Sequence, residues 1–536
     1  MLQEINIVEQ EVFVLSLTSL NRYNFMKKYI LFFLFCVPFI NESFANNLAI
    51  TTPVYNNANK TISFTVSWEN SWKLSAGPNN FDGVWVFVKR QACSNTNTWA
   101  TALLSTTSGD HTSSVSSGTN LLSVDAVSDG MGVFLRRTYS GLGNIGSHTI
   151  TLKLNSSMNT SPAITPSAAD NFKVLGIEMV YVPEAQFYIG DGRGTNSSNF
   201  SAGNNVSTPL LITSAIQSAG LGASTVYTSN SMYGCPNYLP STFPLGYNGF
   251  WCMKYETSVA SYVDFLNCLS YDQQATRLAK WGTRYPNSVN TYFTSYGSYK
   301  AAVYTSVAGT YNTIPATFTF NTTYMNYIPI SYLSWTDLTA YLDWTGLRPM
   351  TDFEYEKACR GTLNPVPYEY PWGNTSITQC TGTGTNAGTF QERPSQAGEG
   401  LCLYSWNDQN WAPYRSGSFA TQITTRSQCG ATYYGIMEMG GNLMEQVVGG
   451  GSGYDYSNFT TANGDGALGA DGNANTTGWP TGIGANQGNY CKGGDYVGNG
   501  GSTIIQVSDR QYYGGNTVNN GQNNGTGGRG VRSYPN

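Results

Sequence analysis

The chain has 536 residues, of which only 11% are charged, and its formal net charge is −5. Average soluble proteins carry roughly 25% charged residues, so neutral polar residues must supply much of this surface. The sequence contains no basic patch, which argues against nucleic acid as a partner. Such an uncharged polar surface suits an extracytoplasmic protein that works by contact, although a mere compositional habit would produce the same surface.

The first 45 residues carry the pattern of a secretion signal. Residues 26–45 read MKKYILFFLFCVPFINESFA: two lysines, an apolar run, and small residues that end at Ala45. The order is typical of a cleaved signal peptide, and the run is too short to span a bilayer. We expect a signal peptide over 1–45, with a spurious upstream extension over 1–25. The mature protein is then secreted, periplasmic or at the cell surface, with no membrane span.

Residues 46–170 predict an all-β sandwich, because apolar and polar residues alternate in four runs separated by Asn, Gly and Ser clusters. The runs are 62–68, 84–89, 132–137 and 148–154. Four aromatic residues are expected to fill the core, with a sugar-stacking platform as the alternative. They are Trp68, Trp72, Trp85 and Phe87. The Ser/Thr/Pro-rich segment 156–170 predicts a domain boundary.

The region after this boundary predicts few helices and much loop. It opens with an alternating strand and a glycine turn at 176–192, and 255–269 has apolar residues at helical spacing. Long Gly/Asn/Thr/Ser stretches without regular structure complete it. They are 192–248, 375–400 and 448–490.

Two further helices are indicated by their ends. At 334–346, Ser334 predicts an N-cap, with Asp337 in the first turn and a closing glycine. At 351–361, Thr351 and Glu354 predict a capping box, and another glycine closes the helix.

Nine cysteines follow the signal, without any C-x-x-C pair. The two histidines, His111 and His148, lie upstream of eight of them, which argues against zinc. In an oxidising compartment we expect disulfides among these eight, with open connectivity. Cys93 is then left over as a buried thiol. The eight are Cys235, Cys252, Cys268, Cys359, Cys380, Cys402, Cys429 and Cys491.

A series of motifs runs in order through residues 173–536. It comprises EMVYVPEAQFYIGDG (178–192), FWCMKYETSVASYVDFLN (250–267), PISYLSWTDLTAYLDWTGLRPMTDFEYEKACRG (329–361), YPWGN (370–374), GIMEMGGNLMEQ (435–446), KGGDY (492–496) and GVRS (530–533). The series resembles the formylglycine-generating enzyme, or sulfatase-modifying factor, family. The resemblance implies that family's loop-rich variant of the C-type lectin-like fold. The expected fold class is therefore α+β, with an N-terminal all-β sandwich over 46–170 and a sulfatase-modifying-factor-like domain over 173–536.

The resemblance also shows what is missing. In the family's oxidase, two cysteines after the glycine pair bind copper and activate oxygen, converting a substrate cysteine to formylglycine. Alignment on KGGDY places these positions at Gly498 and Thr503, and neither supplies the thiolate that Cu(I) needs. The family's iron-dependent branch needs a histidine cluster, and this domain has no histidine. The resemblance thus implies no catalytic residue and argues against copper.

Two catalytic alternatives stay open. One is an active sulfatase-modifying oxidoreductase that draws its cysteine pair from elsewhere, such as Cys491 with Cys429. The other is a carboxylate pair for glycoside hydrolysis, Asp495 with Glu445 or Asp509, although no spacing rule joins these acids. The glycines over 493–501 are more typical of tight turns than of a phosphate cradle.

The resemblance further implies structural calcium. Its ligands would be Glu438, the carbonyls of Gly441 and Leu443, and Glu445; the alternative makes both glutamates ordinary helix-flank acids. A second site would use Asn386, the carbonyl of Ala387, Asp408 and the carbonyl of Asn410.

With the oxidase chemistry absent, we expect a secreted binding or structural protein. Loops 496–503 and 510–526 would form its contact face, because Tyr, Asn and Gly give rigid contact area and adaptable hydrogen bonds. The partner is an unknown peptide, a glycan or another copy of the chain; alternatively, these loops only fill space. Arg532 is expected to stabilise the fold through a buried carboxylate or carbonyl. The predicted cleft residues are Asp495, Tyr496, Gly498, Thr503, Tyr512 and Tyr513.

Overall fold

The chain divides into two compact units, Met1–Glu42 and Ser43–Asn536, and the described residues all belong to the second. The predicted signal peptide lies outside them. No helix of the described part is long and apolar enough to cross a membrane. The computed structural model describes residues 47–95, 97–155, 166–193, 199–202, 207–222, 226–227, 238–278, 285–293, 302–321, 327–381, 384–387, 389–404, 412–421, 424–449, 458–481, 488–498, 501–510 and 524–534.

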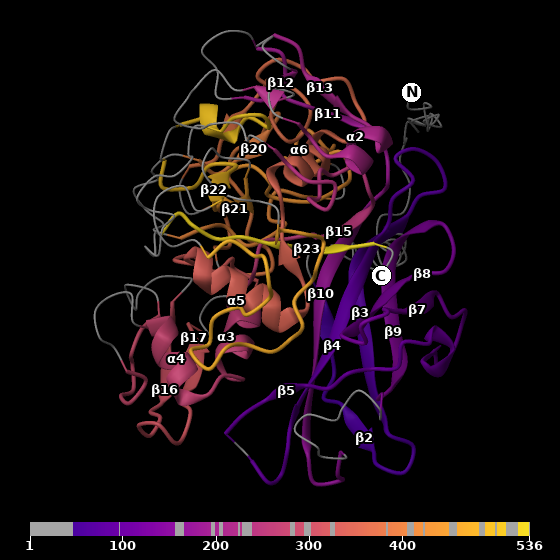
Figure 1. Cartoon of the computed structure of the whole chain (residues 1–536), viewed down its shortest axis with the longest axis vertical. Helices are drawn as coiled ribbons and strands as arrows, with labels where there is room; N and C mark the ends of the chain where they lie inside the picture. The colour runs from indigo at the N-terminus through magenta and orange to yellow at the C-terminus, as the bar shows by residue number, and fades with distance from the viewer. Residues whose placement is uncertain are drawn as a thin grey trace, which may run out of the picture. The chain divides into compact units, whose positions relative to one another are not determined.

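Two antiparallel sheets dominate the first half of the unit (Figure 1). The five-stranded sheet contains β1 (Ala49–Ile50), β2 (Val54–Asn56), β3 (Thr61–Lys73), β9 (Gly141–Lys153) and β6 (Thr112–Ser114). The eight-stranded sheet contains β18 (Arg348–Pro349), β23 (Gly530–Ser533), β15 (Phe250–Met253), β10 (Asn171–Val182), β4 (Asp82–Gln91), β8 (Gly132–Arg137), β7 (Leu122–Ala126) and β5 (Ala100–Thr101). The four predicted strand runs are confirmed as β3, β4, β8 and β9.

Strand β4 is buried on both faces, which corrects the predicted aromatic core. Its valines face the same apolar cluster as Trp68, between the two sheets. Because side chains alternate along a strand, Trp85 and Phe87 point the other way and pack with Trp344. Trp72 is only half-buried, with its ring 4.9 Å from Lys254 Nζ. Of the four aromatics, only Trp68 therefore belongs to the core between the sheets.

Strand β10 joins the two halves of the sequence in one sheet. One edge pairs with β4, from Asn171 opposite Gln91 onward. The other edge pairs with β15. In the same sheet, β15 pairs with β23, and β23 pairs with β18 (Figure 1). The predicted boundary at 156–170 lies mostly outside the described residues, and the strand that follows it shares a sheet with strands from both predicted domains.

The capped helices form as the sequence indicates. Helix α5 (Trp335–Thr345) begins after Ser334, whose capping box with Asp337 is complete, and it ends at a left-handed glycine. Helix α6 (Asp352–Arg360) begins with the predicted Thr351–Glu354 box. Helix α3 (Val259–Leu266) is shorter than predicted, because Ser258 caps it four residues into the periodic stretch.

Two helices were not predicted. Helix α4 (Tyr271–Leu278) buries Gln274 and Arg277, so its buried face lacks an apolar stripe. The short helix α2 (Ser214–Ala219) lies inside the predicted loop 192–248. The remaining elements are the strand pairs β11 (Phe187–Ile189) with β13 (Leu210–Ile212), β12 (Ser201–Ala202) with β14 (Val226–Tyr227), β16 (Val303–Val307) with β17 (Thr317–Phe320), β19 (Thr378–Gln379) with β20 (Leu401–Cys402), and β21 (Glu445–Val448) with β22 (Asn489–Lys492), and the 3-10 turns η1 (Ser108–Asp110) and η4 (Thr503–Ile505).

The cysteines differ from expectation. Eight of the ten lie in the described part, and none of these eight forms a disulfide. Seven are buried; Cys252 and Cys359, for example, pack in one apolar cluster with Val180, as small apolar groups do. Cys93, predicted to be buried, is exposed, because it lies just beyond the end of β4.

Candidate functional site

The glycine-rich stretch after β22 is a tight turn, as predicted. Gly493 and Gly494 have φ angles of 84° and 68°, which favour glycine. A Cβ on Gly494 would lie 2.9 Å from the side chain of Ile505. The Asp495 carboxylate accepts a hydrogen bond of 2.9 Å from the Gly498 backbone N–H, which closes the turn.

The predicted cleft residues lie at different depths. Asp495 and Tyr496 are buried, with exposed fractions of 1% and 7%. Gly498 is half-buried, and Thr503 is exposed where η4 begins. Tyr512 and Tyr513 lie outside the described residues. Among the described cleft residues, then, only Gly498 and Thr503 present themselves at the surface.

The thiols nearest this turn in sequence are buried. Cys491 lies on β22 opposite Gln446 and contacts Met444. Burial raises the pKa of the Cys491 thiol, and the Asp495 carboxylate raises it further. Cys429 belongs to a different apolar cluster, and burial raises its pKa as well. Both groups are therefore neutral thiols at physiological pH, whereas thiolates are the reactive and metal-binding form.

The guanidinium of Arg529 contacts both predicted calcium glutamates, the side chain of Glu445 and the backbone of Glu438. Arg529 Nε donates to Glu445 Oε1 at 2.6 Å, and Arg529 Nη2 donates to the Glu438 carbonyl at 3.1 Å. Glu438 Oε1 accepts from the Gly417 N–H at 2.8 Å. The Oε2 atoms of Glu438 and Glu445 are buried without a hydrogen-bond partner. Burial, above all, raises the pKa of Glu438 to about 7.

A third carboxylate completes this cluster. Glu256 Oε1 accepts from the Leu443 N–H at 2.9 Å, and Glu256 Oε2 accepts from Asn442 Nδ2 at 2.6 Å. Burial raises the pKa of Glu256, and repulsion from Glu445 raises it further. Within the described ranges, no three His, Cys, Asp or Glu side chains form a metal-binding group. The predicted calcium set needs only two side chains, and its two orphaned oxygens have the hard chemistry that calcium prefers.

The second predicted calcium site is described only in part. Asn386 is exposed, and its carbonyl accepts hydrogen bonds from the Thr389 N–H and Oγ1 at 3.1 and 2.7 Å. Ala387 is half-buried. Asp408 and Asn410 lie outside the described residues.

The acids proposed as a hydrolytic pair have separate partners. Asp495 closes the glycine turn, and Glu445 holds Arg529. Asp509 lies 3.6 Å from Arg193 Nη1. These partners give each carboxylate a structural role.

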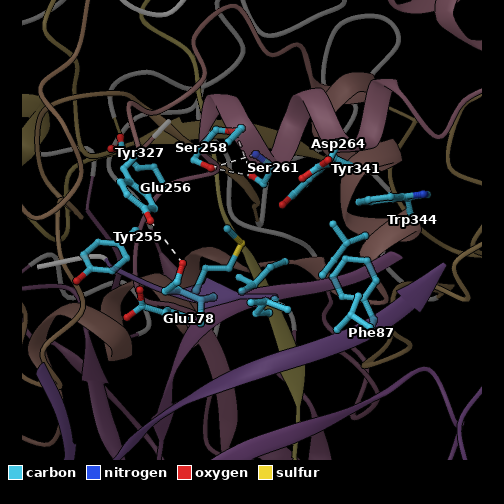
Figure 2. A pocket seen from close by; sticks show the side chains of 18 residues that line it. Phe87, Glu178, Tyr255, Glu256, Ser258, Ser261, Asp264, Tyr327, Tyr341 and Trp344 are labelled. Atoms are coloured by element: carbon cyan, nitrogen blue, oxygen red, sulfur yellow. Dashed lines mark hydrogen bonds between the residues drawn. The ribbon is translucent and has the colours of Figure 1, made fainter. Parts of the chain in front are cut away.

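A pocket that sequence reasoning missed lies between β10 and α3. It has a volume of about 340 Å³, within the range of small-molecule sites. Figure 2 shows Tyr255, Tyr327 and Glu178 at one end and Phe87 and Trp344 at the other. No local motif could reveal it, because its walls come from β1, β4, β10, β15, α3 and α5.

The comparisons with known proteins now define the class of this chain. The family model for the sulfatase-modifying factor enzyme 1-like domain matches residues 237–532, more than half of the chain. The chain therefore belongs to the sulfatase-modifying factor enzyme 1-like domain family, as the motif series indicated.

Similarity to a characterised relative is more limited. The formylglycine-generating enzyme of Thermomonospora curvata is 46% identical over 46 residues. The alignment covers 9% of this chain and 14% of that enzyme. So short a match supports common descent of this domain and leaves the activity of the chain to be argued from its own residues.

Proposed function

We propose that this protein is a secreted binding or structural protein that uses the family scaffold without the oxidase chemistry. One observation carries the proposal: Gly498 and Thr503 stand where the resemblance places the copper-binding cysteines. A glycine and a threonine supply no soft ligand for Cu(I). The buried, neutral thiol of Cys491 on the neighbouring strand supplies none either.

The second candidate is an active formylglycine-generating oxidoreductase that uses Cys491 with Cys429. Its support is family membership. The described geometry favours the first candidate, because these thiols lie in different apolar clusters with raised pKa values.

A copper(I) titration against a competing chromophoric chelator distinguishes the two. The proposal predicts no stoichiometric copper binding in Cys93→Ser, the variant that lacks the exposed thiol. Stoichiometric copper binding that is lost in Cys491→Ser but kept in Cys93→Ser would support the oxidoreductase instead.

The scaffold itself is proposed to be the family's C-type lectin-like fold. Helices α2 to α6, short strand pairs and long connecting loops are compatible with it. In such a scaffold, loops carry recognition, so loops 496–503 and 510–526 remain the proposed contact face for a peptide, a glycan or another copy. Since Tyr496 is buried, the contact would come from the residues around it.

Calcium is proposed at the Glu438–Glu445 cluster. The ligands would be one oxygen of each carboxylate and the carbonyls of Gly441 and Leu443. The support is the pair of buried Oε2 atoms without partners, which a divalent cation would satisfy. When bound, calcium would supply positive charge to a cluster of three buried carboxylates, of which Glu445 pairs directly with the Arg529 guanidinium.

A further inference from the structure

The pocket between β10 and α3 has an unusual charge composition. Its wall is formed by 18 residues, and three of these are carboxylates: Glu178, Glu256 and Asp264. Among the described residues of this wall there is no Lys, Arg or His. A cavity lined by charges of one sign attracts the opposite charge, because its low-dielectric walls concentrate the field.

Glu178 is the carboxylate of the three that has a buried oxygen without a hydrogen-bond partner. Its Oε2 lies 3.2 Å from Lys254 Nζ, but this ammonium is shared with Asp82 at 3.5 Å. Its Oε1 is buried and accepts no hydrogen bond. An ionised oxygen in that position costs free energy until a donor reaches it. The buried, incompletely compensated charge of Glu178 therefore favours a positively charged ligand over a neutral one in this pocket.

The other two carboxylates, Glu256 and Asp264, favour an organic cation over a metal ion as the ligand. Both Glu256 oxygens accept protein hydrogen bonds. Asp264 is partly exposed and lies 4.0 Å from Lys173 Nζ, a weak pairing. No metal-binding group of three such side chains exists in the part of the chain described. Dispersed carboxylates suit an organic cation better than a metal ion, which needs its ligands gathered around one point.

The rest of the wall fits the body of such a ligand. Figure 2 shows the rings of Phe87, Tyr341 and Trp344 gathered at the end away from Glu178, with Tyr255 and Tyr327 near the acidic end. Aromatic faces attract cations and bury apolar groups. The pocket therefore runs from an acidic, tyrosine-lined end to an apolar, aromatic end.

We propose that this pocket binds a small organic cation, a primary ammonium or guanidinium carried on a short apolar or aromatic body. The positive group would meet Glu178, and the body would lie against Phe87 and Trp344. A free amine and the basic side chain of a peptide share this chemistry. The pocket contains none of residues 492–503, so the proposal does not depend on the loss of oxidase chemistry.

Calorimetric titration of the mature full-length chain with three probes tests the proposal. 2-Phenylethylamine carries the cation and the aromatic body, 2-phenylethanol is its neutral counterpart, and an acetylated, amidated Gly-Arg-Gly peptide presents the cation on a side chain. We expect the amine or the peptide to bind at least about tenfold more tightly than the alcohol. The tighter of the two cations identifies the source. If neither cation binds at least about tenfold more tightly than the alcohol, the proposal is wrong.

Two variants locate the site, with Asp272→Asn as a matched control on the exposed face of α4. Glu178→Gln should weaken cation binding by at least about tenfold, because the replacement keeps the shape and removes the charge. Ala260→Phe should abolish binding by filling the pocket from α3 without disturbing the buried ion pair. Should Glu178→Gln fail to fold, Ala260→Phe decides. Wild-type affinity in a folded Glu178→Gln or Ala260→Phe would contradict the site.

Discussion

Glu438 illustrates how burial sets the chemistry of a single residue in this protein. It lies at a positive φ of 51°, and one of its carboxylate oxygens has no partner. Its raised pKa, about 7, has burial as its main cause and Glu445 as a contributor. A carboxyl group whose pKa is raised on folding stabilises the folded state below its unfolded pKa, and that contribution disappears as the pH rises through about 7.

This leads to a prediction about pH and calcium. In chelator, Glu438→Gln should match the wild type at pH about 5 and exceed its stability at pH about 8, by on the order of 3 kcal/mol. Millimolar calcium should stabilise the wild type increasingly over the same pH range and leave Glu438→Gln unchanged. Chemical denaturation at both pH values, with exposed Glu399→Gln as the control, measures this. Wild-type stability independent of calcium at pH 8 would contradict the calcium proposal.

Arg532 has the buried carbonyl partner that the sequence predicted, whereas its carboxylate partner, Asp129, is exposed. Its Nη2 lies 2.6 Å from Asp129 Oδ2, its Nη1 donates to the Gly346 carbonyl, and its guanidinium lies 4.3 Å from the Trp85 ring centroid. The prediction was possible because a buried arginine requires an acceptor. The identity of Asp129, far away in the sequence, was not predictable from the local pattern.

Among the helices and strands, the features that depend on a few consecutive residues were predictable. The capping boxes of α5 and α6 need only four consecutive residues, and both are present. Burial of β4 on two faces was not predictable, because its second face is covered by Trp344 and other residues far along the chain. The pocket at Glu178 was not predictable for the same reason, since six separate elements form it.

The α6 capping box gives a second prediction. Thr351 Oγ1 accepts from the Glu354 N–H at 3.2 Å and donates to the Pro244 carbonyl at 2.9 Å. Thr351→Ala should destabilise the fold by about 1–2 kcal/mol, and Thr351→Ser should restore most of the loss because it keeps the hydroxyl. Urea denaturation of both variants measures this. Equal losses in Ala and Ser variants would show that the methyl group, not the cap, matters.

The whole molecule is organised around the shared sheet. Strand β10 pairs with β4 on one edge and with β15 on the other, so the predicted sandwich and the family domain have continuous hydrogen bonding. The sequence indicated β4 and β10 but neither β15 nor the pairing of the three strands, because register depends on contacts between residues far apart along the chain. The Ser/Thr/Pro-rich segment predicts a boundary in the chain, but it does not determine whether the strands before and after it pair in one sheet.

The shared sheet predicts a single unfolding transition. Calorimetry of the full chain should give one endotherm for the unit Ser43–Asn536, and Arg532→Lys should move it as a whole, because Arg532 connects β23 to Asp129 in the N-terminal half. Two separated endotherms, with only the later one moved by Arg532→Lys, would show that the segments before and after 170 fold independently.

The central claim is that this family member binds without oxidising a substrate cysteine. Conversion of a cysteine peptide to formylglycine, followed by mass spectrometry with added copper and oxygen, tests it most directly. An active formylglycine-generating enzyme serves as the positive control. We expect no conversion by the wild type, by Cys491→Ser or by Cys429→Ser. Conversion by the wild type that either substitution abolishes would contradict it.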